Sequence, residues 1–102
     1  MSDAPMKAIL DLDRMVHEPA RLAILTVLSA AEEVEFLFLL KVTGLTKGNL
    51  SAQSQKLEAA GFLKTRKAFR GRVPVTSFKL TVAGRKALGA YHQQLRALLP
   101  ET

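Results

Sequence analysis

The stretch Gly44–Gly61, GLTKGNLSAQSQKLEAAG, specifies both ends of one helix through local chemistry. Gly44 can take the left-handed conformation that ends a preceding helix. Thr46 can then cap the next helix with its hydroxyl oxygen. Gly61 provides a stop for that helix and should bring Phe62 onto its last turn, against Leu57. A helix end, a tight turn and a capped second helix in this order predict a helix-turn-helix.

The segments before this turn predict further helices. Residues 36–42, FLFLLKV, fit a strand or a short helix on their own, and the turn at Gly44 favours a helix, so we place the helix-turn-helix at about residues 36–61. Pro19 suits the first position of a helix that extends to about Ala31. An earlier helix, capped by Asp3 and interrupted at residues 17–19, would place four apolar residues on one face: Met6, Ile9, Leu10 and Val16.

Residues 62–80 predict a β-hairpin. Phe62–Phe69 and Val75–Leu80 are rich in Phe, Thr and Val, which favour strands, and residues 70–74, RGRVP, form the turn between them. A helix-turn-helix followed by a hairpin is the order of a winged helix, with the hairpin as its wing at about residues 62–80.

The last predicted helix, about residues 81–99, begins at a Thr81 cap. Five residues along it step by 4, 3, 4 and 3, a spacing typical of a seam between two helices: Gly84, Leu88, Tyr91, Leu95 and Leu98. We expect this seam, together with Ile9, to form the interface of a homodimer. The predicted fold is therefore mainly α with a small β-hairpin: one winged helix-turn-helix domain, residues 1–102, with N- and C-terminal dimerisation helices.

The charges are segregated along the chain. Residues 1–35 carry seven acids and three bases, a net charge of −4, whereas residues 36–100 carry twelve bases and one acid, Glu58, a net charge of +11. Like charges at this density repel one another and oppose compaction. A polyanionic partner relieves that repulsion, and nucleic acid is the commonest such partner.

Other function classes find little support. The absence of Cys removes disulfides, thiolate metal sites and thiol redox sensing, and two His residues make a poor metal-ligand set. No nucleophilic or paired-carboxylate motif indicates an enzyme. The start of the chain lacks a secretory signal pattern, and the longest apolar run is too short to span a bilayer. We expect a cytoplasmic protein without a cofactor, and no polar constellation marks a small-molecule effector site.

The helix of residues 47–60 offers a small, polar outer face for a DNA groove. Asn and Gln side chains can pair with adenine, and Ser can contact bases or phosphates. The first turn carries Lys47 and no acid, although the helix dipole favours acids there; a nearby phosphate would offset that cost. Ser54 lies on the inner face, where Leu would pack better. Either the helix tilts to expose it, or its hydroxyl bonds to the carbonyl four residues earlier.

The hairpin carries six cations and no acid, and Arg70 and Arg72 flank the turn glycine, Gly71. Both arginines are placed to reach phosphates or a minor groove. Cations on edge strands also prevent aggregation, which explains some of these residues. Lys56 and Lys67 complete the set of candidate DNA contacts, although a solvated helix surface explains Lys56 about as well.

Several motifs resemble one family of proteins. Residues 17–25, HEPARLAIL, resemble the opening of ArsR- and MarR-like regulators, and residues 46–51 and 57–61 resemble their recognition helix. Residues 69–76 and 80–85 resemble the wing and last helix of compact, single-domain MarR-like winged-helix proteins. The resemblance covers about residues 8–95 and implies a homodimeric regulator of transcription, usually a repressor, that binds double-stranded DNA. By position, it implies groove contacts from Thr46, Lys47, Asn49, Ser51 and Gln53, and wing contacts from Arg70 and Arg72.

We therefore expect sequence-specific binding of double-stranded DNA by a homodimer. An alternative remains open, because winged helices also serve as protein-interaction modules, and a basic one could dock an acidic partner. Binding of DNA at moderate salt, without a second protein, distinguishes the two.

Overall fold

The structure of the protein, a computed structural model, describes residues 4–100. This part of the chain folds into five helices and one three-stranded antiparallel sheet, with the strand order β1-β3-β2. The elements in chain order are α1 (Ala4–Leu10), α2 (Pro19–Ser29), β1 (Val34–Glu35), α3 (Phe36–Thr43), α4 (Lys47–Ala59), β2 (Leu63–Arg70), β3 (Val73–Leu80) and α5 (Val82–Leu98). The predicted order of a helix-turn-helix, a hairpin and a last helix is confirmed.

The ends of α4 follow the local chemistry of the sequence. Gly44 ends α3 with a φ of 71°, and the Thr46 hydroxyl accepts a hydrogen bond from the Asn49 N–H at 3.1 Å. At the other end, Gly61 has a φ of 80°, and the Phe62 N–H donates to the Leu57 carbonyl at 2.9 Å. This pair of features is a Schellman motif, so the start and the stop of α4 are both confirmed.

The start of α2 combines a predicted feature with one that the sequence analysis missed. Pro19 occupies the first turn as expected, because its missing N–H needs no partner there. The cap is Glu18, whose carboxylate accepts the N–H groups of Ala20 at 3.1 Å and Arg21 at 2.7 Å.

The second strand of the hairpin is longer, and the turn is tighter, than expected. Arg70 pairs with Val73, so the turn is only Gly71 and Arg72. Gly71 has a φ of 66°, whereas Arg72 does not have a positive φ, which is the sign pattern of a type II′ turn. That turn suits the twist of two paired strands. The five-residue turn was therefore wrong, and Val73 and Pro74 belong to β3.

Two other expectations near the N-terminus are corrected. Sequence analysis predicted no strand before the helix-turn-helix, but Val34 and Glu35 form β1, which pairs with Phe78 and Ser77 of β3. A strand this short carries no alternation pattern in the sequence. The first helix ends at Leu10, and Val16 is buried from the loop that follows, not from a helical face. The proposed cap Asp3 lies outside the described residues.

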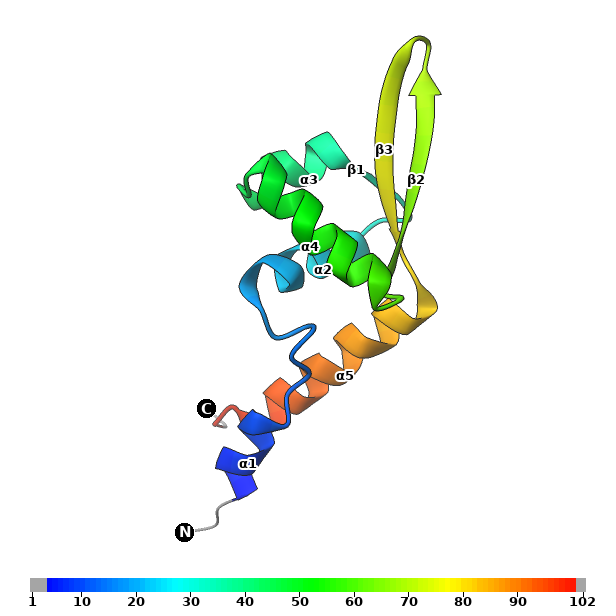
Figure 1. Cartoon of the computed structure of the whole chain (residues 1–102). Helices are drawn as coiled ribbons and strands as arrows, with labels where there is room; N and C mark the ends of the chain where they lie inside the picture. Colours follow the sequence, from blue (N-terminus) through cyan, green and yellow to red (C-terminus); the bar gives the residue numbers. More distant parts are fainter. Residues whose placement is uncertain (1–3, 101–102) are drawn as a thin grey trace.

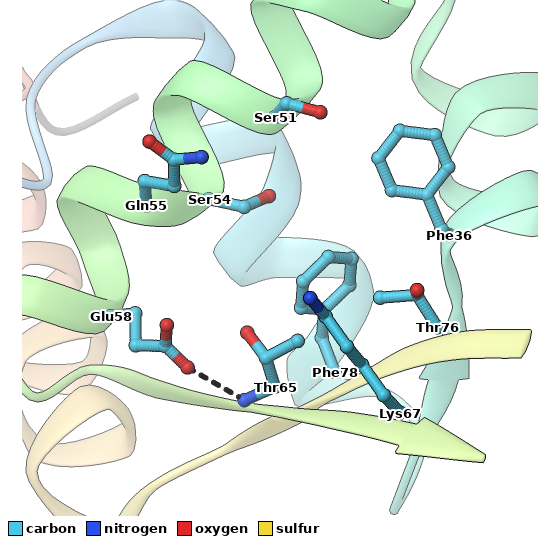
Figure 2. Close-up of a pocket in the computed structure, with 9 residues that line it drawn as sticks. All are labelled: Phe36, Ser51, Ser54, Gln55, Glu58, Thr65, Lys67, Thr76 and Phe78. Carbon is cyan, nitrogen blue, oxygen red and sulfur yellow. Dashed lines mark hydrogen bonds between the residues drawn. The ribbon is translucent and has the colours of Figure 1, made fainter.

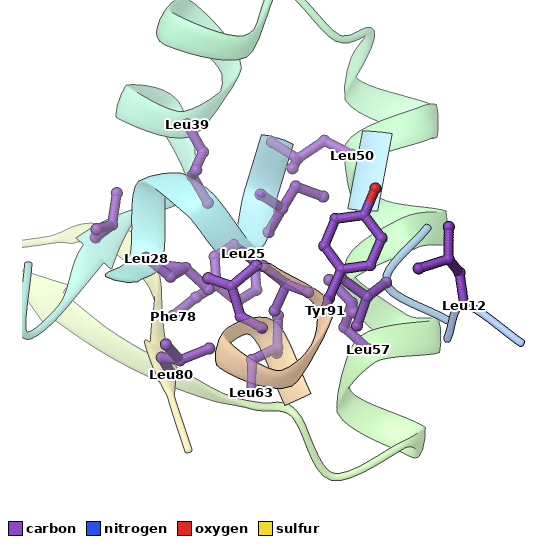
Figure 3. Packing of buried hydrophobic residues seen from close by; sticks show 14 residues of the cluster. Leu12, Leu25, Leu28, Leu39, Leu50, Leu57, Leu63, Phe78, Leu80 and Tyr91 are labelled. Carbon is purple, nitrogen blue, oxygen red and sulfur yellow. The ribbon is translucent and has the colours of Figure 1, made fainter. Parts of the chain in front are cut away.

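The core lies where α2, α3, α4 and α5 meet the inner face of the sheet (Figure 3). Leu25, Leu39, Leu50 and Leu57 are completely buried there. The seam on α5 also belongs to this core, because Leu88 and Tyr91 are 4% and 2% exposed. They pack within their own chain, which corrects their assignment to a dimer interface, whereas Leu95 and Leu98 are only partly buried.

The molecule is elongated, with extents of 62 × 26 × 25 Å. In Figure 1 the hairpin projects at one end, and α1 lies beside the C-terminal part of α5 at the other end. We call this second projection, α1 together with residues 95–99, the arm. No helix between residues 4 and 100 is long and apolar enough to cross a membrane.

Candidate nucleic-acid interface

The N-terminal half of α4 exposes the side chains that were predicted to contact DNA. Thr46, Lys47 and Asn49 are exposed, and Ser51 and Gln53 are half-buried. The first turn of α4 contains no acid, so the positive end of the helix dipole and Lys47 together favour an anion there. The Thr46 hydroxyl oxygen already accepts a hydrogen bond from the Asn49 N–H, so the primary role of Thr46 is to cap the helix.

A hydrogen-bonded network lies behind this surface, and its centre is Arg21 of α2. The Arg21 side chain is only 13% exposed. Its Nε donates to the Met15 carbonyl at 2.7 Å, and its Nη2 donates to the Arg14 carbonyl at 3.2 Å. Its Nη1 donates to Gln53 Oε1 at 2.8 Å. Arg21 therefore joins the loop before α2 to the DNA-facing helix.

The network fixes the orientation of two amides. A guanidinium has only donors, so Gln53 must turn its oxygen to Arg21 and its amino group away. That amino group donates to Asn49 Oδ1 at 3.1 Å. Asn49 consequently keeps its own amino group for an outside partner. In the major groove, two N–H donors match the N7 and O6 acceptors of guanine, as well as adenine N7 and thymine O4. Gln53, by contrast, has both of its polar atoms engaged within the chain, its oxygen by Arg21 and its amino group by Asn49.

Glu18 belongs to the same network. Burial alone would raise the pKa of this carboxyl, but the N–H groups of Arg21 and Ala20 and the nearby Arg21 charge outweigh burial and lower it. Glu18 lies 3.8 Å from Arg21 Nη1, so its ionised form caps α2 and balances the guanidinium. Sequence analysis missed Arg21 as a functional residue, because its hydrogen-bond acceptors come from two segments outside α2, the loop at Arg14 and Met15 and the helix α4.

The hairpin presents two different faces, because successive strand residues point to opposite sides. Arg66 and Arg70 share the face that carries Glu33 and Glu35. Arg70 Nη2 lies 3.0 and 3.1 Å from the two Glu35 oxygens, and Arg66 lies 3.5 Å from Glu33. The hairpin, which carries no acid of its own, therefore gains counter-charges in space, and Arg70 is held by Glu35.

The other face of the hairpin looks toward α4. Thr65 and Lys67 line it together with residues of α4. Neither Lys67 nor Arg72, at the turn, forms an ion pair with any residue in the range 4–100. Lys56 is exposed on α4 as well. The structure thus brings Lys67 to the same side as α4, whereas Arg70 is engaged by Glu35.

A cavity of about 410 Å³ separates α4 from the hairpin (Figure 2). Ser54 points into it and is 4% exposed. Its Oγ has no hydrogen-bond partner, so neither of the two explanations given for this serine holds. Helix tilt does not expose it, and its hydroxyl does not bond to the preceding turn. Within residues 4–100, no cluster of three His, Cys, Asp or Glu residues could hold a metal ion.

Comparison with known proteins agrees with this architecture. A sequence model of the winged helix DNA-binding domain family matches residues 20–99. An uncharacterized protein of Methanocaldococcus jannaschii is 36% identical over 86 residues, which cover 83% of this chain and 92% of that protein.

Solved structures share the fold over most of the chain. A transcriptional regulator homologue from Pyrococcus horikoshii has a TM-score of 0.83 and 29% identity, and the match covers 93% of each chain. CouR, a transcriptional repressor bound to a 23-mer DNA duplex, has a TM-score of 0.70 and 21% identity over 91% of this chain and 68% of its own. A MarR family regulator from Silicibacter pomeroyi has a TM-score of 0.66 and 20% identity, over 94% of this chain and 67% of that chain. The last two likenesses concern the fold alone.

Proposed function

The chain belongs to the family of winged helix DNA-binding domains, and we propose from this premise that it is a homodimeric, sequence-specific regulator of transcription. The observation that carries the proposal is the amide of Asn49, held outward by Gln53 and Arg21 on a helix face beside uncompensated cations. A hydrogen-bond donor of fixed orientation, in positively charged surroundings, suits recognition of a base edge in the groove between two phosphate backbones.

In the proposed complex, α4 enters the major groove. Lys47 and Ser51 contact the flanking phosphates or bases, and Asn49 contacts a base edge. Lys67 and Arg72 of the hairpin, together with Lys56, bind the neighbouring backbone or the minor groove. Gln53 acts as a positioning residue, and Arg70 contributes charge from the hairpin.

We propose that the arm pairs two copies of the chain. Its surface exposes large apolar side chains: Met6 is 68%, Ile9 47%, Leu10 71% and Leu99 58% exposed. Leu95 and Leu98 are partly buried beside them. A clustered apolar surface on a projecting element is typical of an interface, and a two-fold dimer would present two copies of α4 to DNA. Such a dimer favours half-sites about 10 bp apart, centre to centre.

We propose repression as the sign of regulation. The resemblance of residues 46–51 and 57–61 to the recognition helix of regulators that are usually repressors supports this choice. A dimer seated on DNA would block transcription by occupying its site.

The test is binding to duplexes selected from a random library, measured by fluorescence anisotropy across about 50–200 mM salt. Arg72→Ala should weaken binding to all duplexes and lower the salt slope by about one unit. Asn49→Ala should reduce the preference for the selected duplex more than the affinity for random DNA. Arg96→Ala, on the exposed side of the arm, removes the same charge far from α4 and is the matched control. Failure to bind any duplex at the lowest salt refutes the proposal and favours an acidic protein partner.

The dimer has its own test. Leu10→Glu places a charge on an exposed side chain, so the fold should survive while the mass in solution falls from dimer to monomer. A wild-type chain that is monomeric at micromolar concentration contradicts this part of the proposal and leaves DNA binding standing.

A further inference from the structure

Ser54 is the most anomalous residue of α4. Within the described residues its Oγ is the one buried side-chain polar atom that has no hydrogen-bond partner. Native proteins pair nearly all such atoms, so each exception calls for an explanation. Its neighbours on the inner face of the helix, Leu50 and Leu57, are completely buried and apolar. A hydroxyl in this row weakens the packing unless it has a partner that the chain itself does not provide.

The cavity beside Ser54 has room for that partner. Its volume of about 410 Å³ falls within the range of small-molecule sites. Three elements build it: α4 provides Ser51, Ser54, Gln55 and Glu58, the hairpin provides Thr65, Lys67, Thr76 and Phe78, and α3 provides Phe36. In Figure 2 the Ser51 and Ser54 hydroxyls face the space between α4 and the hairpin, with the Phe36 ring on its opposite side.

The walls favour a planar ring. The Phe36 ring packs on the Phe78 ring, with their centroids 6.2 Å apart and their planes tilted by 46°. Phe78 is only 4% exposed, so the partly exposed Phe36 ring forms the apolar wall. Aromatic faces of this kind stack against flat, polarisable rings. The hydroxyls of Ser51, Ser54 and Thr76 each donate and accept hydrogen bonds. A ring whose edge alternates donors with acceptors satisfies them best.

The charges at the rim favour a neutral ligand. Glu58 and Lys67 both line the opening and balance each other. One oxygen of Glu58 accepts the Thr65 N–H at 2.9 Å, and the other faces no donor among the described residues. The carboxylate of an aromatic acid would be repelled by this second Glu58 oxygen. A ring N–H or an amino group would instead donate a hydrogen bond to it.

We propose that the cavity binds a small, uncharged nitrogen heterocycle of the nucleobase type, stacked on Phe36 and hydrogen-bonded to Ser54 and Glu58. This binding does not depend on the function proposed above. Its consequence does rest on that function: Ser51 and Lys67 serve both surfaces, so an occupied cavity competes with DNA.

The probes are free adenine and cytosine, titrated into the whole chain while its backbone amide signals are followed by NMR. Benzoate, an aromatic acid of similar size, is the contrast. We expect saturable shifts at Ser54, Thr65 and Phe78 with a heterocycle, and none with benzoate. Ser54→Ala removes one hydrogen bond and should weaken binding by about tenfold. Ser54→Leu should fill the cavity and abolish binding. Ser29→Ala, on α2, is the matched control and should leave binding unchanged.

Three results would overturn the proposal: no saturable shift with either heterocycle, shifts with benzoate alone, or equal binding by the wild type and Ser54→Ala. Melting temperatures show that each variant is folded. The NMR readout contains no DNA, so it stands even if the protein fails to bind any duplex. Where DNA does bind, a saturating heterocycle should lower the affinity of the wild type and leave that of Ser54→Leu unchanged.

Discussion

Replacing Arg21 with Met tests the network that holds the DNA-facing helix. Methionine keeps much of the aliphatic volume but removes every donor. The Met15 carbonyl and Gln53 Oε1 then lose partners at 2.7 and 2.8 Å in a half-buried site, while the Arg14 carbonyl is exposed and can bond to water. Two abandoned acceptors at about 1–2 kcal/mol each predict a loss of about 2–4 kcal/mol. That is a large share of the ~5–15 kcal/mol available to a domain.

The assay is thermal unfolding followed by circular dichroism. A loss of this size should lower the melting temperature by about 10–20 °C. The matched control is Arg66→Met, which breaks the 3.5 Å pair with Glu33. Both of those side chains are well exposed, at 67% and 38%, so the control should cost less than about 1 kcal/mol.

The same variant should also affect recognition. Without Arg21, Gln53 is free to rotate its amide, and Asn49 loses its fixed orientation. The ratio of affinities for selected and random DNA should therefore fall in Arg21→Met and hold in Arg66→Met. The reasoning is refuted if the two variants unfold at the same temperature, or if Arg21→Met keeps the full preference for the selected duplex.

Three further predictions concern single contacts. The pKa of Glu18 lies below its ordinary value of 4.5, so the stabilisation by its carboxylate is complete above pH 4.5 and is lost as the pH falls through the lowered pKa. Glu18→Gln should therefore lower the free energy of unfolding at pH 7 and reduce the loss of stability in acid, as measured by urea unfolding. An unchanged dependence of stability on acid pH would contradict this. Gly84→Ala should lower the free energy of unfolding by several kcal/mol or prevent folding, because a Cβ there collides with the Phe62 carbonyl and the Leu80 side chain. The control is Gly89→Ala on the same helix, which has open space around it and should be tolerated. Glu35→Gln breaks the ion pair that holds Arg70, whereas Lys67→Gln removes a cation that forms no ion pair within residues 4–100. Lys67→Gln should therefore change DNA affinity more than Glu35→Gln does, and the reverse ranking by anisotropy would make Arg70 the more important contact.

The sequence predicted those parts of the fold that depend on neighbouring residues. The caps at Thr46 and Thr81 and the stop at Gly61 each bond within three to five positions, so residue identity alone determines them. The hairpin strands were found for the same reason. Their exact turn was not, because Val73 and Pro74 also suit a loop and only the register with Phe69 and Arg70 assigns them to β3.

Features that depend on distant residues could not be predicted in this way. The 4-3 spacing on α5 correctly indicated an apolar stripe, but the spacing does not identify what covers it. The structure covers Leu88 and Tyr91 with the chain's own core and leaves Leu95 and Leu98 only partly buried. The His17 ring, which bonds to the Tyr91 hydroxyl at 2.8 Å, anchors the α1–α2 loop to the same stripe. Arg21 was overlooked for a related reason, because the three oxygen atoms that accept its hydrogen bonds come together only after folding.

The charge segregation along the sequence does not by itself predict which charges are paired in the folded structure. In the sequence, acids and bases occupy separate halves, which suggested a hairpin without counter-charges. In space, Glu33 and Glu35 come from the acidic half onto one face of the hairpin, where they pair with Arg66 and Arg70. Four other hairpin cations form no ion pair within residues 4–100: Lys64, Lys67, Arg72 and Lys79. The pattern along the sequence therefore overstated the free charge of the hairpin, because two of its six cations are held by acids that only the fold brings beside them.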